Sequence, residues 1–157
     1  MKKMIGMKLN LAVLIMALSV LFACTKEKDD FKAQDDKLIR EYLATHNLTA
    51  QKSASGLYYI ISVPGDTQKP GLNSQIVIHY KGYLLNGTEF DSSYAGSAPT
   101  FPMANLIAGW REGLQLFGKG GKGTLFIPSG LGYGTSALPG IPANSVLIFD
   151  IHLINIK

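Results

Sequence analysis

The side chains that most often do chemistry are scarce in this chain of 157 residues. None of its three histidines, His46, His79 and His152, has a carboxylate or a second histidine at a metal-ligand spacing. A single cysteine, Cys24, excludes an internal disulfide and a metal site built on cysteines. The sequence also suggests no Ser/His/Asp trio, no phosphate-binding glycine loop and no carboxylate pair. We therefore expect no metal and no cofactor.

The one cysteine lies where lipid modification would need it. Residues 1–8 carry three lysines, and the apolar run over residues 11–22 is 12 residues long, against the roughly 20 that span a bilayer. This is the pattern of a secretory signal. The segment from Leu21 to Cys24 resembles the bacterial lipoprotein signal, in which the cysteine becomes the acylated N-terminus. We predict that residues 1–23 are removed and that Cys24 carries a lipid anchor; the alternative is an ordinary signal peptide with a chance cysteine.

The residues after Cys24 bear on location and partners. Thr25 stands where an aspartate would resemble an inner-membrane retention signal, so we expect the outer membrane. Residues 26–30 resemble the charged tracts that export lipoproteins to the cell surface in some Gram-negative lineages, or they form a solvated tether. Without the three lysines of the signal, 12 basic residues oppose 11 acidic ones. Such a near-neutral domain has no basic stripe for nucleic acid.

A tether and a short helix are predicted before the main domain, together covering residues 24–54. Residues 25–34 are charged and polar, which is typical of a flexible segment. Asp35 or Asp36 can cap a helix that ends near residues 46–47. Its apolar face is formed by two i,i+4 pairs: Leu38 with Tyr42, and Ile39 with Leu43. The helix either lies against the main fold or only spaces it from the membrane, and we expect residues 55–157 to fold alone.

From Ser55 onward the pattern is typical of β-strands and turns. Residues 56–63 form a β-rich run that Pro64-Gly65 stops. Residues 75–84 alternate, with Ile76, Ile78, Tyr80 and Leu84 on the apolar face. Asn86-Gly87 predicts a hairpin turn, after which residues 88–90 return. Residues 124–127 and 145–157 are further strands, and the apolar face of the last one carries Leu147, Phe149, Ile151 and Leu153.

One helix is predicted among these strands. Leu106, Trp110, Leu114 and Phe117 lie on one side at helical spacing, which predicts a helix over residues 105–117 with Asn105 as its N-cap. Four glycines between residues 118 and 123 end it, and residues 129–144 form a loop rich in Gly, Pro and Ser. We therefore predict an α+β fold in which antiparallel strands curl around a single short helix.

Six dispersed segments resemble an FKBP-type peptidyl-prolyl isomerase domain over residues 55–157. In order they are residues 77–84, 87–93 with a Phe-Asp-Ser-Ser signature, 106–114, 127–134, 139–142 and 147–151. Each segment is a weak signal alone, whereas six in the right order are a strong one. The resemblance implies a curved antiparallel sheet wrapped around one short helix. It also implies catalysis of cis–trans isomerisation at X–Pro bonds of exported or envelope proteins, which assists their folding, through a stabilised twisted amide.

The resemblance also implies which residues form the site. The catalytic set is Tyr80, Phe90, Asp91, Trp110, Tyr133 and Phe149, and the substrate-binding set is Phe101, Leu106, Ile107 and Ile141. Trp110 would form the pocket floor, while the Tyr133 hydroxyl and the Ile107 N–H would hold the flanking carbonyls. Asp91 would lie at the pocket edge and accept a hydrogen bond from a tyrosine. Taken singly, each aromatic residue is explained as well by core packing, and Asp91 by a turn that caps Ser92 or Ser93.

Proline-containing polypeptides and macrolide inhibitors are the implied partners, and we expect a monomer. The rim departs from the family pattern, since residues 94–100 contain no arginine and Leu138 replaces a residue that is often polar. These departures leave a second interpretation open, a lipid-anchored peptide-binding or chaperone module with little turnover. A third, a purely structural surface lipoprotein, would need the aromatic residues to be fully packed with no pocket among them.

Overall fold

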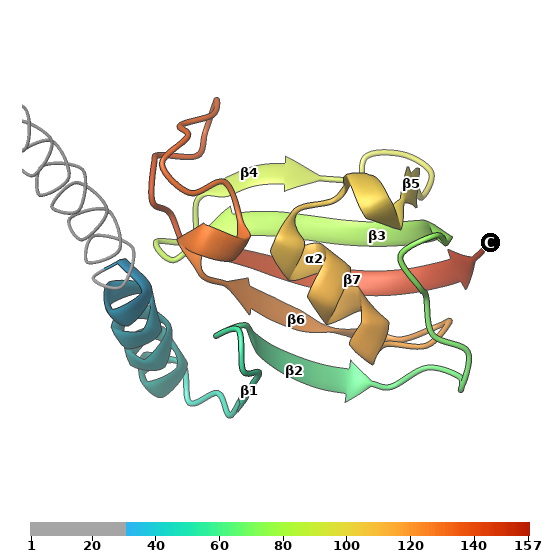
Figure 1. Ribbon diagram of the computed structural model, residues 1–157, viewed down its shortest axis with the longest axis horizontal. Helices are drawn as coiled ribbons and strands as arrows, with labels where there is room; N and C mark the ends of the chain where they lie inside the picture. The colour runs from blue at the N-terminus through green and yellow to red at the C-terminus, as the bar shows by residue number, and fades with distance from the viewer. Residues whose placement is uncertain (1–30) are drawn as a thin grey trace, which may run out of the picture.

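A computed structural model describes residues 31–157 of the chain (Figure 1). The predicted signal peptide, the lipidation of Cys24 and the tether as far as residue 30 lie outside the described residues. Within residues 31–157, no helix combines the length and the apolar character that crossing a membrane requires.

Seven strands form one antiparallel sheet whose order is β1-β2-β6-β7-β3-β4 (Figure 1). The strands are β1 (Gln51–Lys52), β2 (Tyr58–Val63), β3 (Gln75–Leu84), β4 (Glu89–Ser92), β5 (Thr100–Pro102), β6 (Lys122–Ile127) and β7 (Leu147–Ile156). The outer edge of β3 is shared, because β5 pairs with one of its ends and β4 with the other. The Asn86-Gly87 turn connects β3 to β4 as predicted, with Gly87 at a φ of 84° that favours glycine.

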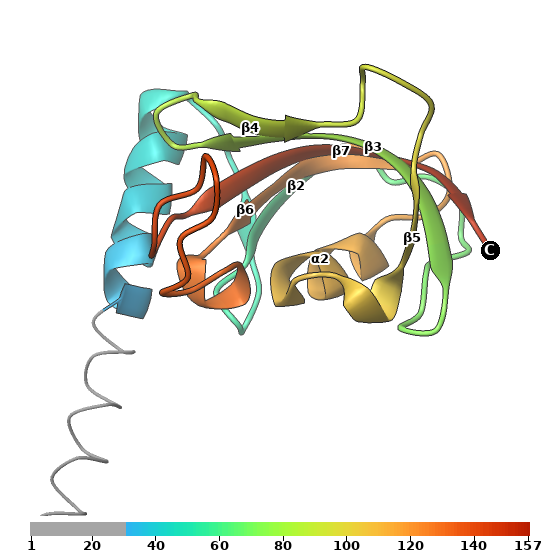
Figure 2. The same ribbon diagram turned by 90° about the horizontal axis from the view of Figure 1, so that it is seen from above.

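The sheet curves around one short α-helix, α2 (Ala108–Gly113), as Figure 2 shows. All four residues predicted for the apolar face of β3, and all four predicted for β7, belong to the core between sheet and helix. The helix can approach β6 closely because it carries glycines one turn apart. A Cβ at Gly109 would lie 2.5 Å from Ile127, and one at Gly113 would lie 2.6 Å from Leu125. The predicted α+β fold is confirmed.

The helical segment differs from the prediction of one helix over residues 105–117. It is split into η1 (Met103–Asn105), α2 and η2 (Leu114–Leu116), the outer two being single 3₁₀ turns. Leu106 and Ile107 separate the first two because both adopt extended backbone, with ψ of 160° and 154°. Ile107, not Asn105, is therefore the N-cap of α2, and Asn105 forms no capping hydrogen bond. This extended pair turns two apolar residues toward the site described below.

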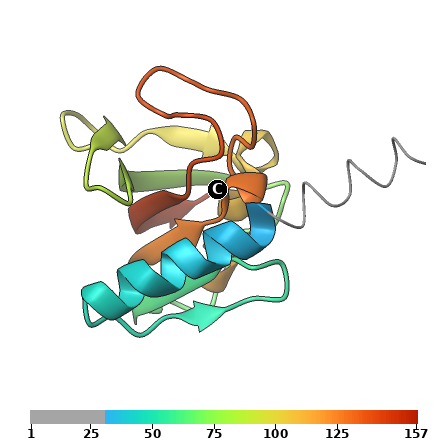
Figure 3. The same cartoon turned by 90° about the vertical axis from the view of Figure 1, so that its left-hand side faces the viewer.

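A longer helix of residues 31–45, the outer helix, packs against the outer face of the sheet and covers one of its ends (Figure 3). It runs through residues 31–45, so residues 31–34 are helical rather than part of the tether, and Asp35 and Asp36 lie inside the helix rather than at its cap. Asn47, with a φ of 54°, ends it near the predicted place. The helix therefore lies against the main fold and is not a mere spacer.

A second apolar cluster forms where this helix meets the sheet. Ile39 and Leu43 pack against residues of three neighbouring strands, namely Tyr58, Phe126 and Ile148. These three are cross-strand partners, and they point away from α2 because side chains alternate along each strand. The sheet is thus buried on both faces at this end.

Candidate functional site

A pocket of about 480 Å³ opens between the curved sheet, α2 and the loop that precedes β7. All ten residues predicted for the site line it: Tyr80, Phe90, Asp91, Phe101, Leu106, Ile107, Trp110, Tyr133, Ile141 and Phe149. Asn105, Leu138 and Pro139 also line it and were not predicted as site residues. In the sequence, the feature that could have indicated these three residues is their proximity to Leu106 and Ile141. The set comes from six separate segments, which explains why no local pattern contains it.

The floor and walls of the pocket are aromatic rings set at steep angles to one another. Trp110 lies 5.1 Å from Tyr80 and 5.1 Å from Phe149 between ring centroids, both at 83°. Phe90 meets Phe149 at 5.5 Å and 83°, and Phe101 meets Trp110 at 6.4 Å and 81°. Edge-to-face packing of this kind is favourable for aromatic pairs and leaves ring faces free to contact a ligand.

The wall formed by Phe90 and Phe149 depends on a residue with no side chain. Gly82 lies opposite Phe149 on β7 and opposite Asp91 on β4. A Cβ at Gly82 would lie 2.6 Å from the Phe90 ring and 2.7 Å from the Phe149 ring. The side chain of any larger residue at position 82 would therefore overlap with both rings.

The hydroxyl of Tyr80 donates a hydrogen bond of 2.7 Å to Oδ2 of Asp91 at the pocket rim. Burial raises the pKa of the Tyr80 phenol, and the hydrogen bond and charge of Asp91 raise it further, so the phenol stays protonated near neutral pH. Asp91 is exposed and belongs to β4, and among the described residues its carboxylate caps neither Ser92 nor Ser93. The structure therefore does not support the alternative in which Asp91 is a turn residue that caps Ser92 or Ser93.

Several hydrogen-bond donors around the pocket lack partners within residues 31–157. The Ile107 N–H and the Tyr133 hydroxyl form no hydrogen bond there, and the buried Nε1 of Trp110 has none either. A buried donor without a partner costs free energy, which favours binding of a ligand that supplies an acceptor. No group of three or more His, Cys, Asp or Glu residues in the described part of the chain could hold a metal ion.

Comparisons with known proteins agree with this geometry. The family model of FKBP-type peptidyl-prolyl cis-trans isomerase matches residues 66–154. The FKBP-type peptidyl-prolyl cis-trans isomerase FkpA of Buchnera aphidicola subsp. Schizaphis graminum is 52% identical over 108 residues, which are 68% of this chain and 43% of that protein. The chain belongs to the FKBP-type peptidyl-prolyl cis-trans isomerase family.

Two solved structures are similar in fold as well as in sequence. The crystal structure of FkpA from Escherichia coli has a TM-score of 0.71 and 38% identity, over 84% of this chain and 62% of that one. A peptidyl-prolyl cis-trans isomerase from Pseudomonas syringae pv. tomato has a TM-score of 0.68 and 30% identity, over 80% of this chain and 95% of that one. The chain spans about half or less of the length of the curated relatives that it matches.

Proposed function

We propose that this protein catalyses cis–trans isomerisation of X–Pro peptide bonds by stabilising a twisted amide. One observation carries the proposal: six aromatic side chains and four leucine or isoleucine side chains line a single pocket whose one carboxylate, that of Asp91, lies at the rim. Such a pocket can bind a prolyl ring, and it offers no buried acid or base to break a bond.

The chemistry needs no bond cleavage. Rotation about a peptide bond faces a barrier of ~18–20 kcal/mol, which is the loss of amide resonance. X–Pro is the natural substrate because its cis and trans forms differ by only ≈0.5–1 kcal/mol. A twisted amide has less charge separation than a planar one. A dry aromatic pocket therefore binds the twisted state better than the ground state, which is the differential binding that catalysis requires.

The residues divide this work between shape and hydrogen bonding. Trp110, which is only 4% exposed, supports the prolyl ring from below. The unpartnered Ile107 N–H and Tyr133 hydroxyl donate to the flanking carbonyls. Tyr80 is held by Asp91, so that its ring keeps one orientation in the wall.

The decisive test is an isomerisation assay on a short peptide in which leucine precedes proline, using the full chain in detergent. We expect the slow cis-to-trans phase to accelerate in proportion to protein concentration. The second candidate, a binding module with little turnover, is favoured by the apolar side chain of Leu138, which is 42% exposed at the rim. Peptide binding that changes the fluorescence of Trp110, the single tryptophan, without acceleration would select that candidate. A purely structural role is disfavoured because the aromatic residues line a pocket.

We further propose that the substrates are exported or envelope proteins and that the protein is held at the outer membrane through Cys24. The lipoprotein-like segment before Cys24 supports this, and several acyl chains at ~0.8 kcal/mol per buried CH₂ would give stable anchoring. Metabolic labelling with a fatty acid should mark the wild type and not Cys24→Ala. Equal labelling of the two would show that the cysteine is not acylated.

A further inference from the structure

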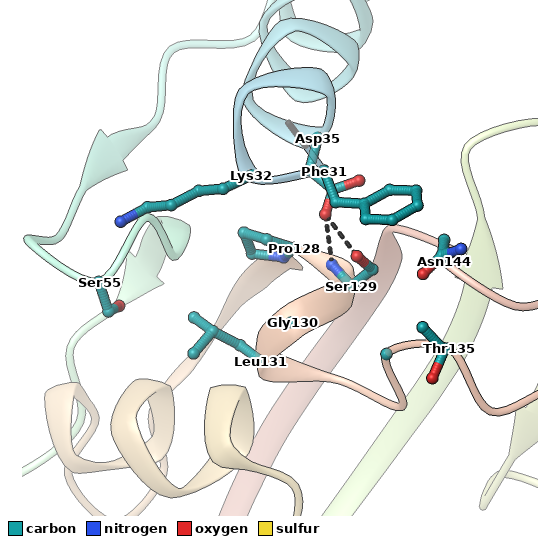
Figure 4. Close-up of a pocket in the computed structure, with 11 residues that line it drawn as sticks. Phe31, Lys32, Asp35, Ser55, Pro128, Ser129, Gly130, Leu131, Thr135 and Asn144 are labelled. Atoms are coloured by element: carbon teal, nitrogen blue, oxygen red, sulfur yellow. Dashed lines mark hydrogen bonds between the residues drawn. The ribbon is translucent and has the colours of Figure 1, made fainter. Parts of the chain in front are cut away.

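The outer helix is joined to the loop before β7 by a buried carboxylate, which Figure 4 shows in close-up. Asp35 is 3% exposed and Ser129 is 2% exposed. Oδ2 of Asp35 accepts two hydrogen bonds from Ser129, one of 2.8 Å from its backbone N–H and one of 2.6 Å from its hydroxyl. A buried carboxylate is costly unless it is hydrogen-bonded, so this pair fixes the position of Ser129 against the helix.

Ser129 in turn fixes the turn that carries Tyr133. Its backbone carbonyl accepts hydrogen bonds from the N–H groups of Gly132, at 3.0 Å, and Gly134, at 2.8 Å. Tyr133 lies between these two residues. The carbonyl of Gly134 then accepts the N–H of Asn144 at 2.7 Å, which closes the base of the loop. A continuous series of hydrogen bonds therefore leads from Asp35 to both sides of Tyr133.

Close packing does not hold this loop on the side of the helix. A second cavity of about 440 Å³ lies there, and Figure 4 shows the residues around it. Its lining includes Asp35 on the helix and Ser129, Leu131 and Thr135 on the loop. The same loop contributes Tyr133, Leu138, Pro139 and Ile141 to the pocket on its other side. Leu131 and Ile141 anchor the loop in the core. The turn around Tyr133, which lies between the two cavities, is held by hydrogen bonds.

We propose that Asp35 is a positioning residue for the isomerase site: through Ser129 it holds the turn that places the Tyr133 hydroxyl at the substrate. The inference rests on the proposed function. It makes the outer helix part of the catalytic apparatus, although no residue of that helix lines the aromatic pocket.

A neighbouring residue provides a matched control. Asp36 also ties the helix to the sheet, because it accepts a hydrogen bond of 2.7 Å from the Tyr58 hydroxyl and pairs with Lys52 and Arg40. It makes no hydrogen bond to residues 128–144. Losing Asp36 should therefore loosen the helix as losing Asp35 does, without releasing the turn at Tyr133.

The test compares Asp35→Ala with Asp36→Ala in the full chain, at a temperature well below both unfolding transitions. We expect kcat/KM on the Leu–Pro peptide to fall about two- to tenfold in Asp35→Ala, the range that loss of one hydrogen bond produces. Asp36→Ala should stay within about twofold of wild type. Asp35→Asn, which keeps an acceptor for Ser129, should retain most of the activity. In a Tyr133→Phe background, Asp35→Ala should cost less than in the wild type, because the hydroxyl that it positions is already gone.

Equal losses in Asp35→Ala and Asp36→Ala would overturn the proposal, and so would an Asp35→Ala effect that Tyr133→Phe leaves unchanged. Amide hydrogen exchange at Gly132 and Gly134 gives a readout that does not need catalysis. Exchange faster in Asp35→Ala than in Asp36→Ala supports the positioning role, and equal exchange refutes it even if the wild type proves inactive as an isomerase. If Asp35→Ala does not fold, Ser129→Ala removes only the hydroxyl bond and takes its place in every comparison.

Discussion

Hydrogen bonding by the Tyr133 side chain can be separated from its contribution to shape. Tyr133 is 37% exposed, and its hydroxyl forms no hydrogen bond within residues 31–157. Tyr133→Phe should therefore leave the fold intact and remove one bond to the substrate, a net loss of ~0.5–1.5 kcal/mol. Because 1.36 kcal/mol is tenfold in rate, turnover should slow by up to about tenfold. Peptide isomerisation measures this, with thermal unfolding as the control for the fold. An unchanged rate would remove Tyr133 from the mechanism.

Asp91 and Tyr80 test whether proton transfer contributes. The pKa of Tyr80 is raised by burial and then by Asp91, so this phenol does not titrate near neutrality. The rate should therefore stay nearly flat from about pH 6 to 8, since no group in the pocket needs to exchange a proton. Asp91→Asn should lower activity without abolishing it, because the amide oxygen can still accept from Tyr80. A folded but inactive Asp91→Asn, together with a bell-shaped pH profile, would require general acid–base chemistry.

The site residues themselves illustrate what the sequence could and could not predict. All ten residues that the family motifs implied line one pocket. Composition and periodicity alone would have assigned Trp110 and Phe149 to the core, and indeed both are 4% exposed. The unpartnered Nε1 of Trp110 could not be predicted, because it depends on every neighbour that the fold brings near.

Among the strands, β3 leaves room for the pocket wall because its residue Gly82 has no side chain. Gly82→Ala would place a methyl group 2.6–2.7 Å from the rings of Phe90 and Phe149. We expect a loss of ~1–3 kcal/mol in unfolding free energy from overpacking, together with lower kcat/KM as the rings move. Chemical denaturation and the peptide assay measure the two effects. Gly71→Ala is the matched control, since Gly71 is exposed and a Cβ added there would have no atom within 4 Å. Equal behaviour of the two variants would contradict the role given to Gly82.

Elements with a regular period were predictable, and contacts across the fold were not. The strict alternation of apolar residues correctly predicted which face of β3 and of β7 points toward the core. The opposite face of β7 carries Ile148, whose burial depends on a helix that precedes it by about one hundred residues. The bond between Asp35 and Ser129 likewise joins residues 94 positions apart. Sequence periodicity describes one element at a time, so it indicated an apolar helix face and left open what would cover it.

At the scale of the whole molecule, the outer helix changes what is expected of the isolated domain. Residues 55–157 stay the unit predicted to fold alone, because the main core is contained in them. Without the helix, however, Tyr58, Phe126 and Ile148 lose the cover of Ile39 and Leu43. We expect a fragment of residues 50–157 to give a folded circular dichroism spectrum but to melt well below the full chain. In the full chain, Ile39→Ala should cost ~2–5 kcal/mol, and Lys37→Ala on the exposed side of the helix should cost little. An unfolded fragment would make the helix essential to folding.

The free energy of unfolding should decrease on acidification in two separate pH ranges, one set by His152 and one by Asp36. Burial, and then the charge of Lys122, lower the pKa of His152 below 6.5. The folded protein therefore binds fewer protons than the unfolded chain, and stability falls as the pH drops through 6.5. Hydrogen bonds from Lys52 and Tyr58 lower the pKa of Asp36 from 3.8 to about 2. Its contribution is complete above pH 3.8 and is lost as the pH falls toward 2.

Asp36→Asn isolates the lower range. Because the amide cannot ionise, the variant should be less stable than wild type at neutral pH, and this difference should shrink as the pH falls from 3.8 toward 2. Thermal unfolding of both proteins at closely spaced pH values measures the difference. Glu41→Gln is the control on the same helix, since its exposed carboxylate pairs with Lys37 at 3.8 Å and such pairs contribute little. A difference between wild type and Asp36→Asn that stayed constant down to about pH 2 would mean that Asp36 joins the helix to the sheet by shape and not by charge.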